Sequence, residues 1–200
     1  MLSMRAPCVV LGFAFISATG AAAQGPRATS APRAQYVSLE DDAYAPQRAS
    51  PRATRVLVDD RTGQAAGSIT VDTKQRALYL SLGGGQAIRY GVGVGRAGFE
   101  WRGRAHVGRK AEWPSWRPPG AMLKRRPDLP RFMNGGIDNP LGARALYLYN
   151  GGRDTLFRIH GTNEPWSIGQ ALSSGCIRMM NDDVTDLYSR VRVGTSVRVI

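Results

Sequence analysis

Residues 158–181 read RIHGTNEPWSIGQALSSGCIRMMN, and the rest of the chain is best understood around this stretch. It contains Cys176 and His160, one of two histidines among 200 residues. A thiol and an imidazole are the minimum for nucleophilic acyl transfer, because the thiolate attacks a carbonyl while the imidazole takes and returns the proton. Gly175 permits a tight turn in which backbone N–H groups face an oxyanion. The stretch therefore predicts a cysteine-based reactive site.

The amino-terminal residues 1–23 predict a signal peptide. A single arginine precedes an apolar run over residues 8–16, and residues 21–23 form a small-residue cleavage site. The run is shorter than the roughly 20 residues that a membrane-spanning helix needs. Cleavage would remove Cys8 and release a soluble, exported protein. Cys176 would then be a solitary thiol in an oxidising compartment, where cysteines are usually paired or absent.

Residues 24–54 predict a disordered linker. They are rich in Ala, Pro, Arg, Ser and Gln and lack apolar periodicity. Such a segment cannot bury enough apolar surface to offset its loss of conformational entropy. A tether that gives the domain reach through a cell wall is the functional alternative. One folded domain is expected over residues 55–200, a length that buries a core without disulfides or metal.

Short alternating segments separated by turns predict a mainly β fold. Candidate strands cover residues 56–59, 68–71, 77–82 and 86–94, with a glycine turn at residues 83–85. The glycines of residues 90–95 lack both the Gly-Lys-Ser/Thr ending and the following helix of a phosphate loop. We therefore expect a strand with close backbone approach there.

The middle section, residues 101–136, predicts a long loop. Five prolines between Pro114 and Pro130 disfavour any long helix or central strand, and one helical turn is expected over residues 121–125. The section also holds three tryptophans, Trp101, Trp113 and Trp116. They either line a substrate groove or anchor the loop to the sheet.

The carboxyl-terminal third predicts a hairpin and a helix. Residues 144–149 alternate as a strand, turn at residues 150–152, and return over residues 155–159 to deliver His160 at the strand end. Asn181 is expected to cap a helix that ends before Gly194. Its buried stripe would be Val184, Leu187, Tyr188 and Val191, and residues 197–200 would form a last strand.

Two motifs in the stretch resemble the signature of the L,D-transpeptidase catalytic domain, also called the YkuD domain. They are HGT at residues 160–162 and SSGCIRM at residues 173–179, with fifteen residues between the histidine and the cysteine. DNPLGARALYL at residues 138–148 and RYGVGVG at residues 89–95 extend the resemblance over roughly residues 56–200. The resemblance implies a YkuD-like β-sandwich of mixed sheets with a few short helices.

The resemblance also implies an activity. In this family a cysteine attacks the meso-diaminopimelate carbonyl of a peptidoglycan tetrapeptide stem, releases D-alanine and passes the acyl group to an amine, without a cofactor. Carried over, Cys176 is the nucleophile and His160 the general base and acid. The Gly161 carbonyl orients the imidazole, and Arg178 meets a substrate carboxylate. The amides of Gly175 and Cys176 form the oxyanion hole.

One residue departs from the family pattern, and several alternatives stay open. The commoner motif is SHGC, whereas Ser174 stands where that second histidine would be. The residues alone do not decide whether His160 or His106 reaches the sulfur. The alternatives to a transpeptidase are a noncatalytic peptidoglycan-binding module, an L,D-carboxypeptidase that uses water as acceptor, and a general secreted cysteine peptidase.

The formal net charge of +12 predicts attraction to polyanions. A cationic periplasmic protein meets peptidoglycan, whose stem peptides bear carboxylates, before it meets nucleic acid, so we expect association with the cell wall. The acyl acceptor would be a stem peptide, a D-amino acid, water or an outer-membrane protein. Two histidines and one mature thiol offer no recognisable metal-ligand spacing, so no metal site is expected.

Overall fold

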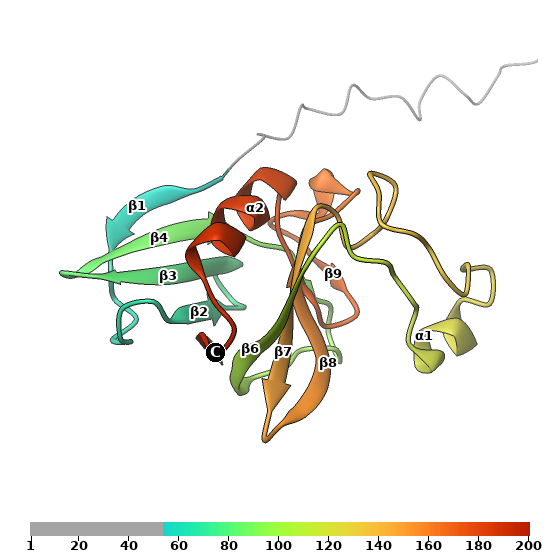
Figure 1. Ribbon diagram of the computed structural model, residues 1–200, viewed down its shortest axis with the longest axis horizontal. Coiled ribbons are helices and arrows are strands. Elements are labelled where there is room, and N and C mark those ends of the chain that lie inside the picture. Colours follow the sequence, from blue (N-terminus) through green and yellow to red (C-terminus); the bar gives the residue numbers. More distant parts are fainter. Residues whose placement is uncertain (1–53) are drawn as a thin grey trace, which may run out of the picture. The chain divides into compact units, whose positions relative to one another are not determined.

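The computed structural model describes residues 54–200 (Figure 1). The predicted signal peptide and the predicted linker up to residue 53 lie outside the described residues. The last residue of that linker, Thr54, is part of the folded domain. Its N–H and hydroxyl groups donate to Asp183 Oδ2 at 2.8 and 2.7 Å. Within residues 54–200, the helices are too short and too polar for any of them to cross a membrane.

Nine strands form one mixed sheet in the order β1-β4-β3-β2-β11-β6-β7-β8-β10, and β5 pairs with β9 in a small second sheet. Two of the pairings in the large sheet, β2 with β11 and β8 with β10, are parallel. The expected mainly β fold of mixed sheets with a few short helices is confirmed. The elements are β1 Val56–Asp59, β2 Ile69–Asp72, β3 Ala77–Gly83, β4 Gln86–Gly91, β5 Val94–Gly95, β6 Gly103–Glu112, α1 Gly120–Arg125, β7 Arg144–Asn150, β8 Arg153–His160, the 3-10 helix η1 Pro165–Ser167, β9 Ala171–Ser173, β10 Ile177–Arg178, α2 Asn181–Arg190 and β11 Ser196–Val199.

The strands before residue 95 follow the predicted alternation with one difference. In β3, Leu78 and Leu80 are buried while Tyr79 between them is half-buried. The strand predicted over residues 86–94 is divided into two. β4 ends at Gly91, and the chain then leaves the large sheet and approaches the segment that holds Cys176. There the Gly93 N–H donates to the Arg178 carbonyl at 2.8 Å, and β5 pairs with β9.

The prediction of a loop over residues 101–136 is wrong for residues 103–112. Residues 103–112 form β6, a central strand that pairs with both β11 and β7. Ala105 and Val107 alternate into the core, and this short apolar alternation outweighs the strand's charged residues. The prolines begin only at Pro114, after the strand has ended. They confine the irregular backbone to the following segment, which holds α1 as its expected helical turn.

The hairpin of β7 and β8 is confirmed. Its turn uses Gly151 and Gly152 at φ +56° and +75°, a region that favours glycine. The closing strand β11 lies in the middle of the sheet, between β2 and β6. Figure 1 shows that β1 to β4 form one wing of the sheet and that β6 to β8 form the other.

The helix α2 packs against β7 and β8 and lies over the junction between the two wings (Figure 1). Its predicted stripe is confirmed, since Val184 and Leu187 are fully buried and Tyr188 packs on the core. The predicted cap is wrong. Met180 occupies the N-cap position, and the side chain of Asn181 bonds to the loop after His160 instead.

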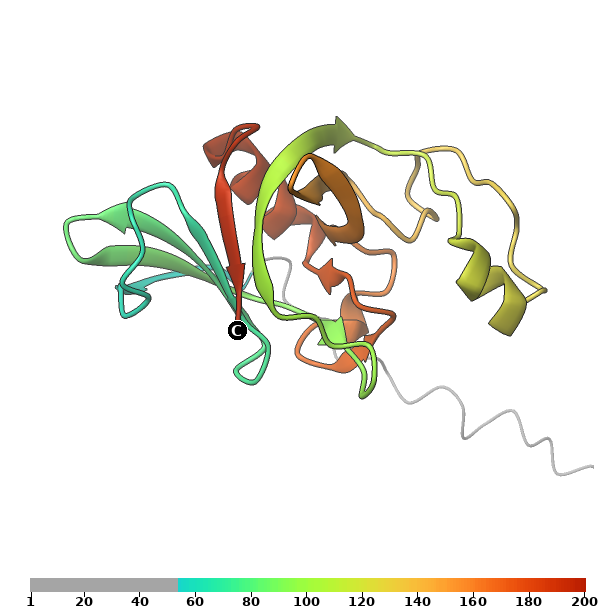
Figure 2. The same cartoon turned by 90° about the horizontal axis from the view of Figure 1, so that it is seen from below.

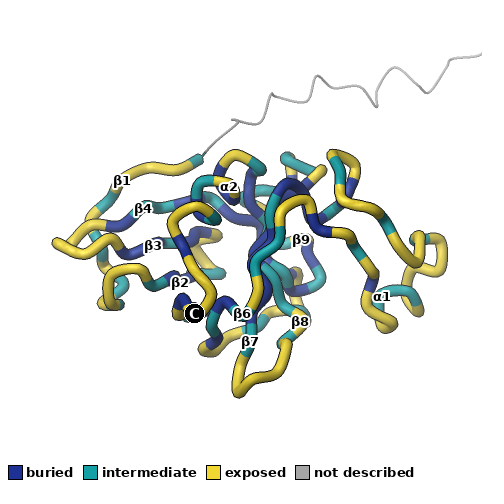
Figure 3. Tube along the Cα trace, viewed as in Figure 1, coloured by how far each residue is buried: buried dark blue, intermediate teal, exposed yellow. Residues whose placement is uncertain are grey.

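The buried positions concentrate along the middle of the strands and on the inner face of α2 (Figure 3). Every residue of α1 is at least partly exposed. Figure 2 shows that α1 and the loops on either side of it extend away from the sheets. The segment around α1 is therefore an appendage to the core rather than part of it.

Candidate active site

His160 and Cys176 lie on neighbouring parallel strands. β8 ends at His160, and β10 begins directly after Cys176. The register pairs Ile177 with Ile159 and Arg178 with His160. Because alternate residues of a strand share one face, Cys176 lies on the same face as His160, while Ile159 and Ile177 point into the core.

This pairing explains the spacing of the two motifs. Parallel neighbours cannot be joined by a tight turn and need a crossover connection of about a dozen residues or more. The fifteen residues between His160 and Cys176 supply that connection, and they hold η1 and β9. The spacing is therefore a requirement of the parallel pair.

His160 is buried and has a defined tautomer. Its Nδ1 lies 2.6 Å from the carbonyl oxygen of Gly161. A carbonyl only accepts, so Nδ1 carries the proton and Nε2 keeps a free lone pair. Burial lowers the pKa of His160 to about 4, and the positive charges of Arg178 and Arg158 act in the same direction. At pH 7 the imidazole is therefore neutral and able to accept a proton.

Cys176 is a free, half-buried cysteine whose Sγ lies 4.0 Å from the Leu156 carbonyl oxygen. Burial raises the pKa of its thiol, while a hydrogen bond from the backbone of Arg158 and the charges of Arg158 and Arg178 oppose that effect. The thiol is therefore protonated at neutral pH. Within residues 54–200, no hydrogen bond joins Cys176 to His160.

Arg158 and Asp154 were missed by the sequence analysis. Arg158 Nη1 and Nη2 donate to the two carboxylate oxygens of Asp154 at 2.6 and 2.8 Å. Asp154 Oδ1 also accepts the N–H of Leu156, which has a left-handed backbone at φ +63°. The pair thus holds the short segment whose carbonyl and amide groups face the sulfur. Its only signal in the sequence is the four-residue spacing, which is common among surface residues.

The turn before the thiol is held by Ser173. The Ser173 hydroxyl donates to the Cys176 carbonyl at 2.6 Å and accepts the Gly175 N–H at 3.1 Å. The Gly175 amide, expected to face an oxyanion, is therefore already bonded within the turn. Among the described residues, the Cys176 amide has no such partner. Ser174 is half-buried, and its hydroxyl makes no hydrogen bond in this part of the chain.

Arg178 is paired within the protein. Its Nη1 lies 2.6 Å from Glu164 Oε2, and its side chain is 21% exposed. The guanidinium that was expected to meet a substrate carboxylate is therefore already paired with Glu164. Glu164 follows HGT by only two positions, so the ion pair also ties the crossover segment to β10.

Asn181 fixes the loop after His160. Its Oδ1 accepts the N–H groups of Ala143 and Thr162 at 2.9 and 3.2 Å, and its Nδ2 donates to the Thr162 carbonyl at 3.0 Å. A Cβ at Gly161 would meet Asn181 Oδ1 at 2.1 Å, so this position requires glycine. The amide of Asn181 therefore occupies the space that the glycine leaves.

His106 lies apart from the sulfur. It belongs to β6 and pairs with Tyr149 and Ser196, whereas β10 is three strand positions away. At about 4.8 Å between neighbouring strands, that is roughly 14 Å along the sheet. His160 is therefore the histidine on the strand next to the thiol.

The tryptophans of the middle section differ in their surroundings. Trp101 stacks on Phe157, with ring centroids 5.0 Å apart and an interplanar angle of 15°. Phe157 in turn touches the position of a Cβ at Gly175. Trp101 is thus an anchor beneath the cysteine turn, whereas Trp113 is 46% exposed. Within residues 54–200, no group of three or more His, Cys, Asp or Glu side chains is placed to hold a metal.

Comparison with known proteins identifies relatives over this same region. Residues 66–199 match the L,D-transpeptidase catalytic domain family, YkuD. The probable L,D-transpeptidase ErfK/SrfK of Escherichia coli (strain K12) is 39% identical over 141 residues, which are 66% of this chain and 43% of that protein. The chain therefore spans less than half the length of this curated relative.

Two solved structures share the fold. One, described as a probable carnitine operon oxidoreductase caia from Brucella melitensis, has a TM-score of 0.51 at 46% identity and covers 75% of this chain and 95% of its own. The catalytic domain of an Enterococcus faecium L,D-transpeptidase acylated by ertapenem has a TM-score of 0.51 at 19% identity. The match covers 69% of this chain and 100% of that domain. The family match extends over well more than half of the residues. This chain belongs to the L,D-transpeptidase catalytic domain family.

Proposed function

We propose that this protein is a periplasmic L,D-transpeptidase that acts on peptidoglycan stem peptides, with Cys176 as nucleophile and His160 as general base and acid. One observation carries the proposal. A buried neutral imidazole, with Nδ1 bonded to the Gly161 carbonyl, lies on the same sheet face as a free thiol of the adjacent strand. This arrangement supports base-assisted attack by sulfur, which needs a neutral imidazole near the thiol.

In the first half-reaction, Sγ of Cys176 attacks the meso-diaminopimelate carbonyl of a tetrapeptide stem, and Nε2 of His160 takes the thiol proton. The carbonyl oxygen becomes an oxyanion, for which the free Cys176 amide is the candidate donor. The bond to D-alanine then breaks, and His160 returns the proton to the departing amine. A thioester on Cys176 remains.

In the second half-reaction, the amine of an acceptor attacks the thioester. His160 takes a proton from the amine and returns one to Sγ as the carbon–sulfur bond breaks, which restores the thiol and leaves a new amide. A stem peptide as acceptor gives a 3-3 cross-link, and a D-amino acid or an outer-membrane protein gives the corresponding attachment. Water as acceptor gives a trimmed tripeptide.

The electrostatics favour proton transfer during attack over a preformed ion pair. Burial raises the pKa of the Cys176 thiol and lowers that of the His160 imidazole, so both groups rest in their neutral forms. A base within reach typically accelerates such a step by about 10²- to 10⁴-fold. The scheme assigns the base to His160, so Ser174 in place of the commoner histidine does not remove the base.

The test is the intact mass of the protein after exposure to a carbapenem, followed by mass spectrometry of muropeptides after incubation with peptidoglycan. We expect a covalent adduct on Cys176, none on Cys176→Ser, and loss of most turnover in His160→Ala. Cross-linked dimers, trimmed tripeptides or protein-linked fragments identify the acceptor. A folded wild-type protein that binds peptidoglycan but forms neither adduct nor product would be a noncatalytic wall-binding module, and the proposal would be wrong.

A further inference from the structure

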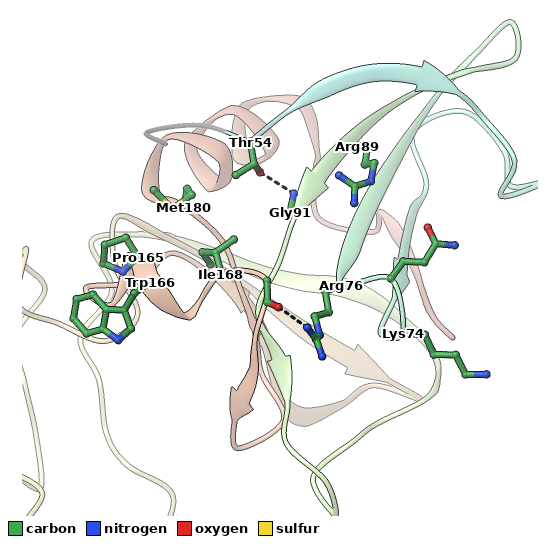
Figure 4. Close-up of a pocket in the computed structure, with 11 residues that line it drawn as sticks. Thr54, Lys74, Arg76, Arg89, Gly91, Pro165, Trp166, Ile168 and Met180 are labelled. Carbon is green, nitrogen blue, oxygen red and sulfur yellow. Dashed lines mark hydrogen bonds between the residues drawn. The ribbon is translucent and has the colours of Figure 1, made fainter. Parts of the chain in front are cut away.

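A cleft lies on the wing formed by β3 and β4, next to the crossover segment that joins His160 to Cys176 (Figure 4). Its volume is about 470 Å³. The turn after β2, the end of β4 and residues 165–169 surround it. Three cationic residues line it, Lys74, Arg76 and Arg89, and among the described lining residues there is neither aspartate nor glutamate.

These three cations have no internal counter-ion. Every salt bridge found within residues 54–200 uses other arginines, so Lys74, Arg76 and Arg89 stay unpaired there. A carboxylate does approach the cleft next to Thr54, but Asp183 already accepts from Thr54 and pairs with Arg55. Uncompensated positive charge in a concave site raises the local concentration of anions.

The turn that presents two of the cations is internally braced. Asp72 Oδ1 accepts the N–H groups of Lys74 and Gln75 at 3.0 and 2.9 Å. Arg76 has a left-handed backbone at φ +51°, and its Nη1 donates to the Gly169 carbonyl at 2.8 Å. Figure 4 shows this bond reaching across to the crossover segment. Only one guanidinium N–H is used in it, so Arg76 retains donors for a ligand.

The opposite wall is apolar and ends at an aromatic side chain. Pro165, Ile168 and Met180 line it, and Trp166 at its end is 52% exposed. An unpaired cationic side facing an apolar side suits a ligand that carries several carboxylates on an aliphatic or sugar-bearing chain. A small inorganic anion would leave the apolar wall and Trp166 without a contact.

We propose that this cleft, lined by Lys74, Arg76, Arg89 and Trp166, binds the carboxylates of a peptidoglycan stem peptide and anchors the enzyme to the wall without taking part in acyl transfer. The inference rests on the proposed function for the identity of the ligand. Cys176 and His160 are not among the residues that line it, so anchoring and chemistry are separable.

The test is sedimentation of the full-length protein with purified sacculi over a series of salt concentrations. We expect Lys74→Gln combined with Arg89→Gln to weaken binding at least tenfold at low salt. The matched control combines Lys124→Gln with Arg131→Gln, which removes the same charge from exposed positions outside the cleft. Its binding should fall no more than twofold. If the double variant fails to fold, the single variant Lys74→Glu, at an exposed turn position, provides the same binding test.

Two further arms identify the ligand. Amidation of the stem carboxylates with a carbodiimide and an amine should abolish the difference between wild type and the cleft variant. The proposal would be overturned if the cleft and control variants lost equal binding to sacculi, or if wild-type protein bound amidated sacculi undiminished. It would also be overturned if the cleft variant lost binding only to phosphatidylglycerol vesicles and not to sacculi. Carbapenem acylation of Cys176 should be the same in all variants. A wild-type protein that binds sacculi through the cleft but forms no adduct would refute the proposed function and leave the cleft standing.

Discussion

Arg158 and Asp154 form a bidentate ion pair beside the Cys176 thiol, with Nη1–Oδ1 and Nη2–Oδ2 distances of 2.6 and 2.8 Å. The Arg158 side chain is 14% exposed and also lies over the ring of Tyr147. The carboxylate raises the pKa of Cys176, and the guanidinium lowers it. The pair therefore keeps the charge near the sulfur close to balanced while it fixes the backbone of Leu156.

Asp154→Asn should make the thiol more reactive. The amide oxygen can still accept the Leu156 N–H, but the negative charge is gone, so the unopposed Arg158 lowers the pKa of Cys176. Iodoacetamide alkylation at pH 8 should become several-fold faster, and Arg158→Gln should slow it. Asp128→Asn is the control, because it breaks an exposed Asp–Arg pair elsewhere. Unchanged alkylation in both Arg158 and Asp154 variants would contradict this view of the pair.

The free energy of unfolding should decrease as the pH is lowered, because of His160. The pKa of its imidazole is about 4 when folded, below the 6.5 of an unfolded chain, so the unfolded state binds more protons between these values. The contribution is fully present above pH 6.5 and is lost as the pH falls towards 4, at about 3 kcal/mol in total. Urea unfolding at pH 7 and pH 4 measures it.

The variant His160→Gln separates this effect from the titration of carboxylates. The loss of unfolding free energy between pH 7 and pH 4 should be smaller in the variant by about 2 to 3 kcal/mol. Equal losses in wild type and variant would show that the imidazole titrates normally in the folded protein. The same low pKa predicts that His160 remains a competent base well below pH 6.5.

Asn181→Ala should destabilise the protein and impair turnover together. Three hydrogen bonds to Ala143 and Thr162 would be lost, at a cost of about 1 to 3 kcal/mol, and the loop that holds Gly161 would loosen. Asn163→Ala removes one exposed bond to the Asp138 carbonyl and is the matched control. Chemical unfolding and the acylation rate measure the two effects. Normal acylation in a destabilised Asn181→Ala protein would confine Asn181 to a structural role.

Gly175→Ala should disrupt the cysteine turn. Gly175 has φ +113°, and a Cβ there would lie 2.5 Å from Phe157 Cε1. We expect a cost of about 2 kcal/mol or more, with acylation reduced through displacement of the thiol. Gly151→Ala, at φ +56° with open space around it, should cost only about 1 kcal/mol. Equal thermal stability of the two variants would show that the turn adapts to the added methyl group.

The sequence predicted most elements that depend on local pattern. The alternation of β3 and β7, the glycine turn of the hairpin and the stripe on α2 are each encoded within a few residues, so they were found. The two motifs also singled out Cys176 and His160 before any geometry was known. These features need no knowledge of what packs against them.

Other features depended on partners distant in the chain. β6 was missed because its charged residues hide a two-sided pairing with β11 and β7, which only the sheet order reveals. The sequence predicts Asn181 as a helix cap, but its side-chain amide fills the space beside Gly161 and bonds to Thr162 instead. The bond between Gly175 and Ser173 likewise removed one of two expected oxyanion donors.

By itself the sequence determined the residue types of the site, their spacing and the mainly β character, because periodicity and glycine positions act locally. Only the tertiary structure decided which histidine lies on the strand next to the thiol, which charges surround the thiol, and that unpaired cations gather in a separate cleft. Those outcomes depend on strand register and burial, which bring together groups that no short stretch of sequence contains.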